Sequence, residues 1–184
     1  MPLVSNKPRV IALGTFDGLH PGHRRVIEMC IARARELDAR ALIYTFWENP
    51  KSLFGRRTLE IMSASEKLTR MLEMGADEVA ADHFTKALSE LSPGEFVEML
   101  IRRFKPLCFV CGEDYSFGRR GAGTVQTLKA LSEAHGIDVC VAPTVNILTH
   151  DGYLGKKVSS TEIRGALIRG ENELAQKLLR GDAI

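Results

Sequence analysis

The stretch RVIALGTFDGLHPGHRRVI, residues 9–27, contains the unit on which the fold is built. Its first five residues, 9–13, are mostly apolar and predict a short buried strand. Glycine, aspartate and proline interrupt the pattern over residues 14–22, and apolar residues of helical spacing follow. Two histidines, His20 and His23, therefore stand where a predicted strand passes into a predicted helix.

The same alternation continues along the chain. The pattern predicts helices at residues 21–37, 65–74, 94–104 and 124–135, and further strands at residues 39–46, 77–81, 107–111 and 138–142. A chain that alternates strands with helices builds a mostly parallel sheet. We expect an α/β protein with an open sheet of about five strands and helices on both faces.

The last part of the chain follows a different pattern. A hairpin is predicted around Asp151-Gly152, and two short helices are expected at residues 161–169 and 172–179. No repeat, low-complexity segment or linker interrupts the sequence. We therefore predict a single domain over residues 1–184.

Composition and charge argue against several classes of protein. The net charge of +2 is too small to indicate a nucleic-acid partner, and the arginine pairs are scattered along the chain instead of forming one stripe. The N-terminus lacks the apolar core of a signal peptide, and no apolar run approaches the ~18 residues of a membrane span. We expect a cytoplasmic enzyme or binding protein for small molecules, without a nucleic-acid or membrane partner; no oligomeric state is predicted.

The cysteines do not suggest a metal centre. Cys108 and Cys111 have the spacing of a metal or redox motif, but they fall within an apolar run that is typical of a buried strand. Residues three apart on a strand point to opposite faces, and no second pair of cysteines or histidines completes a set of four ligands. We therefore predict buried thiols and no protein-held metal.

Ligands of open parallel sheets bind beyond the carboxyl ends of the strands. In this sequence those ends carry residues 14–23, 46–50, 112–118 and 143 onward, which are the parts richest in glycine, polar and aromatic residues. We predict one cleft that is lined by these segments.

The two histidines at the start of the first helix suit phosphate chemistry. A helix N-terminus presents free N–H groups and the positive end of the helix dipole, and nearby glycines let a ligand approach the backbone closely. Side-chain donors that are fixed in advance can stabilise the charge on a reacting phosphate without a covalent nucleophile. Two alternatives to phosphate binding stay open: the histidines could be an accident of helix capping, or they could bind a metal with a third ligand.

A second motif, GKKVSSTEIRGAL at residues 155–167, has a similar character. The hydroxyls of Ser159, Ser160 and Thr161 precede a predicted helix, Arg164 follows one turn later, and two lysines come just before. Capping by Ser160 or Thr161 would by itself explain a hydroxyl at this place. Capping does not require the arginine or the lysines, which favours a phosphate-facing role for the motif.

These motifs carry a resemblance to a known family. Residues 20–23, His-Pro-Gly-His, resemble the His-x-Gly-His signature of the nucleotidylyltransferase superfamily, and residues 159–164 resemble its Ser-Ser-Thr-x-x-Arg signature. Within that superfamily, residues 14–23 and the segment Gly-Glu-Asp-Tyr-Ser-Phe-Gly at 112–118 are similar to the FMN adenylyltransferase module of bacterial bifunctional riboflavin kinase/FAD synthetases. The resemblance covers nearly the whole chain.

The resemblance implies a Rossmann-like fold and a reaction in which AMP passes from ATP to FMN, giving FAD and pyrophosphate, with Mg²⁺ held largely by phosphates and water. It implies catalytic roles for His20, His23 and Arg164. The implied ATP site combines both signatures: Gly14, Thr15, Phe16, His20, His23, Ser160, Thr161 and Arg164. The implied flavin site combines residues from two loops: Asp114, Tyr115, Phe117, Trp47 and Asn49.

Two features depart from the family's pattern. The family commonly has Phe-x-Pro-His-Pro after the second strand, whereas residues 46–50 read Phe-Trp-Glu-Asn-Pro, with Asn49 in place of the histidine. Trp47 either stacks on the flavin ring or covers the end of the sheet. The family also usually continues into a riboflavin kinase domain, whereas this sequence stops near the end of the first module. If the sequence is the whole protein, another protein must supply FMN.

Three other functions are open at this point. A nucleotidylyltransferase that uses ATP or CTP with a different phosphate-bearing acceptor, such as phosphopantetheine or glycerol phosphate, is kept open by the altered residues 46–50. A non-catalytic flavin or nucleotide sensor is disfavoured, because it does not need the two histidines and the arginine. A class I aminoacyl-tRNA synthetase shares a similar histidine signature, but the chain is too short for an anticodon-reading domain.

Overall fold

A computed structural model describes residues 7–55, 58–148 and 154–183. Its centre is a five-stranded sheet in which all neighbouring strands are parallel, in the order β3-β2-β1-β4-β5. The strands are β1 (Arg9–Leu13), β2 (Arg40–Phe46), β3 (Glu78–Asp82), β4 (Pro106–Gly112) and β5 (Asp138–Ala142). The prediction of an open, parallel, Rossmann-like sheet of about five strands is confirmed.

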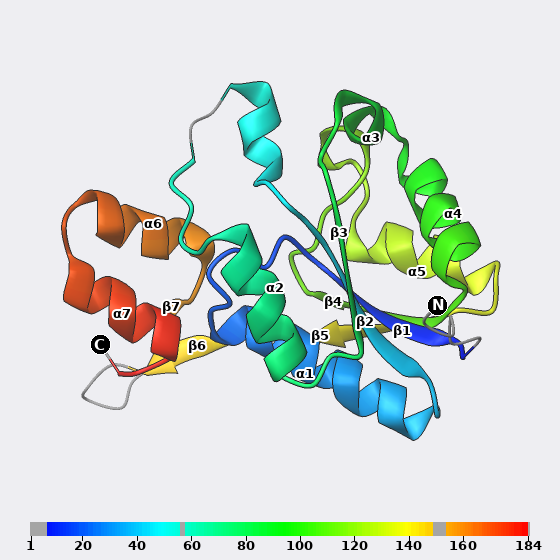
Figure 1. Cartoon of the computed structure of the whole chain (residues 1–184), viewed down its shortest axis with the longest axis horizontal. Helices are drawn as coiled ribbons and strands as arrows, with labels where there is room; N and C mark the ends of the chain where they lie inside the picture. The colour runs from blue at the N-terminus through cyan, green and yellow to red at the C-terminus, as the bar shows by residue number, and fades with distance from the viewer. Residues whose placement is uncertain (1–6, 56–57, 149–153, 184) are drawn as a thin grey trace.

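Helices cover both faces of this sheet (Figure 1). The helices α1 (Pro21–Glu36) and α2 (Ala64–Glu73) pack on one face, and α4 (Pro93–Phe104) and α5 (Val125–Glu133) pack on the other. Successive residues of β1 therefore enter different cores, and the strand is apolar from Val10 to Leu13 because these residues are buried on both sides of the sheet. In the described ranges, no helix combines the length and the apolar character that a membrane crossing requires.

The cysteines of β4 follow the same alternation. Cys108 lies in the core beneath α1, and Cys111 lies in the core beneath α4 and α5. Both thiols are buried and free. The prediction that these two cysteines are buried and point to opposite faces of the sheet is confirmed.

Three short helices lie in segments for which the sequence predicts no helix. The helix η1 (Pro50–Phe54) begins after Asn49, whose side chain accepts a hydrogen bond from the backbone N–H of Lys51 at 3.0 Å, and it ends at Gly55, which has a φ of 71°. The others are α3 (Lys86–Glu90) and η2 (Arg119–Gly121). Elements of five residues or fewer are too short to show an apolar period.

The C-terminal part forms a small layer at one end of the sheet (Figure 1). The strands β6 (Asn146–Leu148) and β7 (Leu154–Lys157) pair antiparallel, which confirms the predicted hairpin; its predicted turn, Asp151-Gly152, lies outside the described residues. The helices α6 (Ser160–Ile168) and α7 (Asn172–Arg180) pack with them around a core of their own: Ile147, Val158, Ile163, Ala166, Ala175 and Leu178.

The order of the strands reverses beside β1. From β1 the chain moves outward to β2 and β3 on one side, and it then returns to β4 and β5 on the other side. Loops that leave two neighbouring strands in opposite directions open a crevice, which is where open sheets bind ligands. The fold therefore places a site at the carboxyl ends of β1 and β4.

Candidate active site

A cleft of about 690 Å³ lies at this point of the sheet, within the size range of small-molecule sites. Its lining includes residues 13–16, 112–118, 142–145 and 157–161, together with Phe46 and Pro50. All four segments that the sequence places at the strand ends contribute to it. The prediction of one cleft lined by these segments is confirmed.

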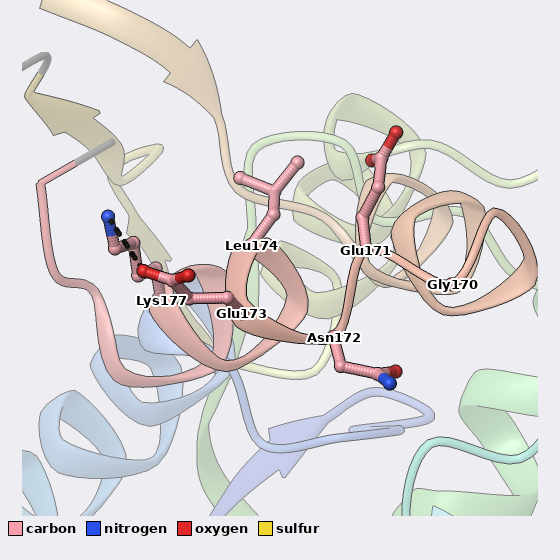
Figure 2. Close-up of a pocket in the computed structure, with 6 residues that line it drawn as sticks. All are labelled: Gly170, Glu171, Asn172, Glu173, Leu174 and Lys177. Atoms are coloured by element: carbon pink, nitrogen blue, oxygen red, sulfur yellow. Dashed lines mark ion pairs between the residues drawn. The ribbon is translucent and has the colours of Figure 1, made fainter.

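A second hollow lies at the start of α7, lined by Gly170, Glu171, Asn172, Glu173, Leu174 and Lys177. Figure 2 shows that these side chains do not converge: Glu171 and Asn172 point away from each other, and Glu173 turns toward Lys177. Glu173 and Lys177 form an ion pair of 3.6 Å one helical turn apart on the surface. This hollow is the outer surface of a helix, and the large cleft is the candidate site.

His20 and His23 line the cleft at the start of α1, and we call this part of the cleft its head. His20 precedes the first residue of α1 but its side chain makes no capping hydrogen bond, so capping does not explain it. The two rings are stacked, with 3.7 Å between their centres. The Nδ1 atom of each ring is buried and has no hydrogen-bond partner in the part of the chain that the structure describes. Buried polar atoms ordinarily have partners, so two unpaired ring nitrogens side by side indicate that these histidines serve more than packing.

Both imidazoles are neutral at pH 7. Burial lowers the pKa of His20 to about 4, and the positive charge of Arg24 acts in the same direction. Burial also lowers the pKa of His23 well below its usual value, and the neighbouring His20 adds to the effect. A neutral imidazole carries one N–H donor, which it can offer to a phosphate oxygen. A phosphate bound beside the rings adds negative charge and thus raises both pKa values.

The loop between β1 and α1 has an unusual backbone. Phe16 and Leu19 have φ values of 52° and 45°, in the left-handed region that residues other than glycine rarely adopt. The buried ring of Phe16 folds back over Gly14, where a Cβ atom would come within 2.9 Å of the ring, and it meets the ring of His23 edge-on at 5.5 Å. Gly14, Thr15 and Phe16 all line the cleft. Backbone strain of this kind persists where neighbouring contacts fix it, and it is concentrated at functional sites.

Asp17 joins the two motifs. Its carboxylate forms a buried ion pair with the guanidinium of Arg164 and accepts a hydrogen bond from the backbone N–H of Ile61 at 3.3 Å. Its backbone carbonyl accepts a hydrogen bond from the Ser160 hydroxyl at 2.9 Å. The loop of the first motif and the first turn of α6 are thus fixed to each other. Sequence reasoning missed Asp17, because an acidic residue in a glycine-rich loop has no pattern of its own.

The first turn of α6 presents hydroxyls to the cleft. The helix is capped by Ser159, whose hydroxyl accepts a hydrogen bond from the backbone N–H of Glu162 at 3.2 Å. The suggestion that Ser160 or Thr161 caps the helix is therefore wrong. Both of these residues line the cleft, as expected for phosphate-binding groups.

Arg164 lies behind the wall of the cleft and is not part of its lining. Its side chain is 11% exposed, its Nε donates to the carbonyl of Leu59 at 2.9 Å, and its terminal nitrogen holds Asp17. The structure therefore brings Arg164 to the site through Asp17, while its direct contact with a ligand stays a prediction.

One wall of the cleft is aromatic and comes from the loop after β4. Tyr115 and Phe117 stack on each other with 5.5 Å between ring centres and 15° between ring planes, and both line the cleft. Asp114 lines it as well and forms an ion pair with Lys157 at 2.7 Å, which lowers the pKa of the Asp114 carboxyl. The three predicted residues of this loop are thus together in the cleft, beside a flat apolar surface.

Trp47 and Asn49 are placed differently from the expectation, because neither lines the cleft. The Trp47 ring stacks on His83 with 6.2 Å between ring centres, and the Asn49 side chain caps η1. Lys51 and Phe54 of η1 line the cleft instead, and sequence reasoning missed both. The sequence signal for Phe54 is an aromatic residue within a predicted loop. In the structure this residue is 66% exposed.

Comparison with known proteins identifies relatives along most of the chain. A family model described as FAD synthetase matches residues 4–162. The chain is 32% identical over 174 residues to a bifunctional riboflavin kinase/FMN adenylyltransferase from Listeria monocytogenes. The alignment covers 93% of this chain and 53% of that protein. It is 31% identical over 172 residues to a putative bifunctional riboflavin kinase/FMN adenylyltransferase from Geobacillus thermodenitrificans. That alignment covers 92% of this chain and 88% of the other protein.

A solved structure has the same fold. It is that of a protein from Streptococcus pneumoniae described as a macrolide-efflux protein, with a TM-score of 0.80 and 28% sequence identity over 95% of this chain and 56% of that one. The chain spans about half the length of the Listeria and Streptococcus proteins. Because the family model matches the sequence from residue 4 to residue 162, the chain belongs to the FAD synthetase family.

Proposed function

We propose that the chain is an FMN adenylyltransferase, which transfers AMP from ATP to FMN and produces FAD and pyrophosphate. The observation that carries the proposal is that Asp17 joins the two signature motifs beside a cleft that residues of both motifs line together with an aromatic wall. Nucleotidyl transfer needs fixed phosphate-binding groups at one end and a place for the acceptor at the other. The relatives that are described as FMN adenylyltransferases support the same reaction.

In this reaction an oxygen of the FMN phosphate attacks the α-phosphorus of ATP. A new P–O bond forms, the bond from the α-phosphorus to the bridging oxygen breaks, and pyrophosphate leaves with the electron pair. No covalent bond to the protein is required. The protein therefore acts by positioning the two phosphates and by stabilising the charge that develops on them.

We assign the phosphates of ATP to the head of the cleft. The neutral rings of His20 and His23 donate to phosphate oxygens, and the backbone of residues 14–16 lies against the nucleotide. Ser160 and Thr161 offer the free N–H groups of the first turn of α6, and Thr161 adds its hydroxyl, to hold the leaving pyrophosphate; the Ser160 hydroxyl already donates to the Asp17 carbonyl. Arg164, one turn further along α6, holds Asp17 and so keeps the first turn of α6 beside the loop after β1. We propose that it contacts the phosphates of ATP once they are bound.

We place the flavin ring against the wall formed by Tyr115 and Phe117, with Asp114 at its edge. The departure from the family's pattern at Asn49 does not argue against FMN, because Asn49 does not line the cleft. A direct contact of Trp47 or Asn49 with the flavin requires that the loop before η1 move toward the cleft. An acceptor other than FMN loses its main support for the same reason.

We propose that Mg²⁺ enters the site together with ATP. Among the residues described, no three side chains of His, Cys, Asp or Glu are grouped so as to hold a metal ion. Phosphate oxygens and water then provide most of the ligands, which is usual for this ion. When bound, Mg²⁺ supplies positive charge that neutralises the leaving pyrophosphate.

The test is a direct assay of the product. The purified chain is incubated with FMN, ATP and Mg²⁺, and the flavins are separated by chromatography. Parallel reactions contain CTP in place of ATP, or riboflavin in place of FMN. We expect FAD only from FMN with ATP. No FAD in any reaction, with ATP binding retained in calorimetry, would exclude FMN as the acceptor.

A further inference from the structure

Lys67 is buried beside the cleft, and the proposed reaction does not use it. It lies in the first turns of α2, is 6% exposed and does not line the cleft. Its hydrogen-bond partners within the described ranges are all uncharged. In the part of the chain that the structure describes, the carboxylates of Asp17, Glu60 and Glu48 act on the ammonium only from a distance, without a direct ion pair. Burial of an ammonium group is costly, so a position that served packing alone would favour an apolar side chain. Burial accordingly lowers the pKa of Lys67.

The ammonium of Lys67 joins the carboxyl ends of two strands. Its Nζ donates to the carbonyls of Thr15 at 3.1 Å and Phe46 at 2.7 Å, and it lies 3.4 Å from the hydroxyl oxygen of Thr45. Thr45 and Phe46 end β2, and Thr15 lies two residues after the end of β1. The three N–H donors of one ammonium match these three acceptors.

The Thr15 carbonyl connects this contact to the first motif. It accepts a second hydrogen bond, from the Thr45 hydroxyl at 3.0 Å, and so has two donors on one side. The next residue is Phe16, which has the left-handed φ of 52° and whose ring meets His23. A shift of the Thr15 carbonyl therefore moves Phe16, and with it the ring against which His23 rests.

An electrostatic link supports the same connection. The positive charge of Lys67 contributes to the lowered pKa of His23, after the larger effects of burial and of His20. The ammonium is thus close enough to His23 to act on it electrostatically.

We propose that Lys67 is a positioning residue for adenylyl transfer: its ammonium fixes the Thr15 carbonyl and thereby sets Phe16 and the His23 ring at the head of the cleft. The kinetic part of this proposal rests on the proposed function. The geometric part concerns the ligand-free loop and is independent of the reaction.

The kinetic test uses three variants. Lys67→Met removes the ammonium and keeps an unbranched apolar side chain; because a displacement of about 1 Å in a catalytic group costs about 100-fold, we expect kcat to fall by roughly 10- to 100-fold. The KM for FMN should change little, since the aromatic wall is unaltered. Lys67→Arg keeps charge and donors and should recover part of kcat. Leu68→Ala, the control, changes the next residue of α2, which packs on the core, and should lower stability while leaving kcat unchanged.

A kcat within about twofold of wild type in Lys67→Met, less than the expected effect of displacement, would overturn the proposal. The second readout is amide hydrogen exchange of residues 14–20 without ligand. We expect faster exchange in Lys67→Met than in Leu68→Ala, and equal rates would also overturn it. If Lys67→Met does not fold, Lys67→Gln removes the ammonium and keeps a polar side chain, and unchanged exchange of residues 14–20 in that variant overturns the proposal. A wild-type chain that makes no FAD refutes the proposed function alone, since the exchange readout does not need turnover.

Discussion

The carboxylate of Asp17 and the guanidinium of Arg164 pair inside the protein, although 147 positions separate them in the chain. Each side chain is 11% exposed. The pair holds the loop after β1 against α6, so that two motifs from opposite ends of the sequence form one site.

Removal of either partner of this pair should destabilise the fold. In Asp17→Ala or Arg164→Ala the remaining charge is buried without a partner, which costs about 3–5 kcal/mol. The double variant should lose less than the sum of the single ones, because it leaves no orphaned charge. Urea unfolding of the four proteins measures this coupling, and strictly additive losses would contradict it. Glu171→Ala, which breaks an exposed ion pair with Arg169, is the control and should leave the unfolding midpoint unchanged.

His23→Ala should lower turnover with little effect on ATP binding. A fixed donor that meets developing charge contributes about 100- to 1,000-fold to kcat, whereas binding has many other contacts. FAD formation gives the rate and calorimetry gives the ATP affinity. His135→Ala is the matched control, because His135 lies on the surface beside Glu98 at 3.1 Å and should not affect either quantity. Wild-type turnover in His23→Ala would show that the histidine is not catalytic.

The neutral state of His20 makes stability depend on pH. Its pKa is about 4 in the folded protein and near 6.5 in the unfolded chain, so the unfolded chain binds more protons between these values. The free energy of unfolding should fall as the pH drops from about 6.5 toward 4, on the order of 3 kcal/mol from this group. Urea midpoints at about pH 7 and about pH 5 should differ less in His20→Gln than in wild type. Equal differences would contradict the assignment.

Gly118→Ala should disturb the aromatic wall. Gly118 has a φ of 71°, and a Cβ atom there would come within 2.8 Å of the backbone nitrogen of Pro93, which cannot move freely. Displacement of the neighbouring Phe117 should raise the KM for FMN more than the KM for ATP. Gly136→Ala is the control, since Gly136 has a φ of 66° with nothing within 4 Å and thus carries the same backbone strain without the clash. A similar KM in both variants would show that the contact with Pro93 has no effect on the wall.

The role of Asn49 as a cap predicts a contrast between two variants. Asn49→Ala loses the cap of η1, worth about 1 kcal/mol, and should loosen Lys51 and Phe54 at the mouth of the cleft. Asn49→Ser keeps a capping hydroxyl. We expect the KM for FMN to rise severalfold in the alanine variant alone. An equal rise in both would favour direct contact between the Asn49 amide and the flavin.

The sequence predicts the sheet well because strands buried on both faces are continuous apolar runs, and the helices between them have a clear period. It also predicts the cleft, since the topology of a parallel sheet brings all its carboxyl ends to one edge. His20, His23, Ser160, Thr161, Asp114, Tyr115 and Phe117 all reach the cleft or its head because they lie directly at those strand or helix ends.

Other parts of the site depend on contacts that no local pattern encodes. Lys67 sits in an amphipathic helix, where a lysine is usually exposed, and only the packing of α2 on the strand ends buries it. Asp17 depends on a partner from the far end of the chain. Trp47 stacks on His83, which lies far from it in the sequence. The helix η1 is too short to produce an apolar period, so the sequence does not reveal the path of the loop after β2.

The place of β1 in the sheet has a consequence for synthesis on the ribosome. The strand β1 occupies the centre of the sheet, yet its edge toward β4 stays open until β4, which begins at Pro106, has been made. The ion pair of Asp17 forms later still, because its partner Arg164 belongs to α6. Closing contacts over such distances is slow and has a high entropic cost. A stalled nascent chain that ends before α6 therefore displays both histidines but has no assembled site, and translation must reach α6 before the segment around His20 can acquire its function.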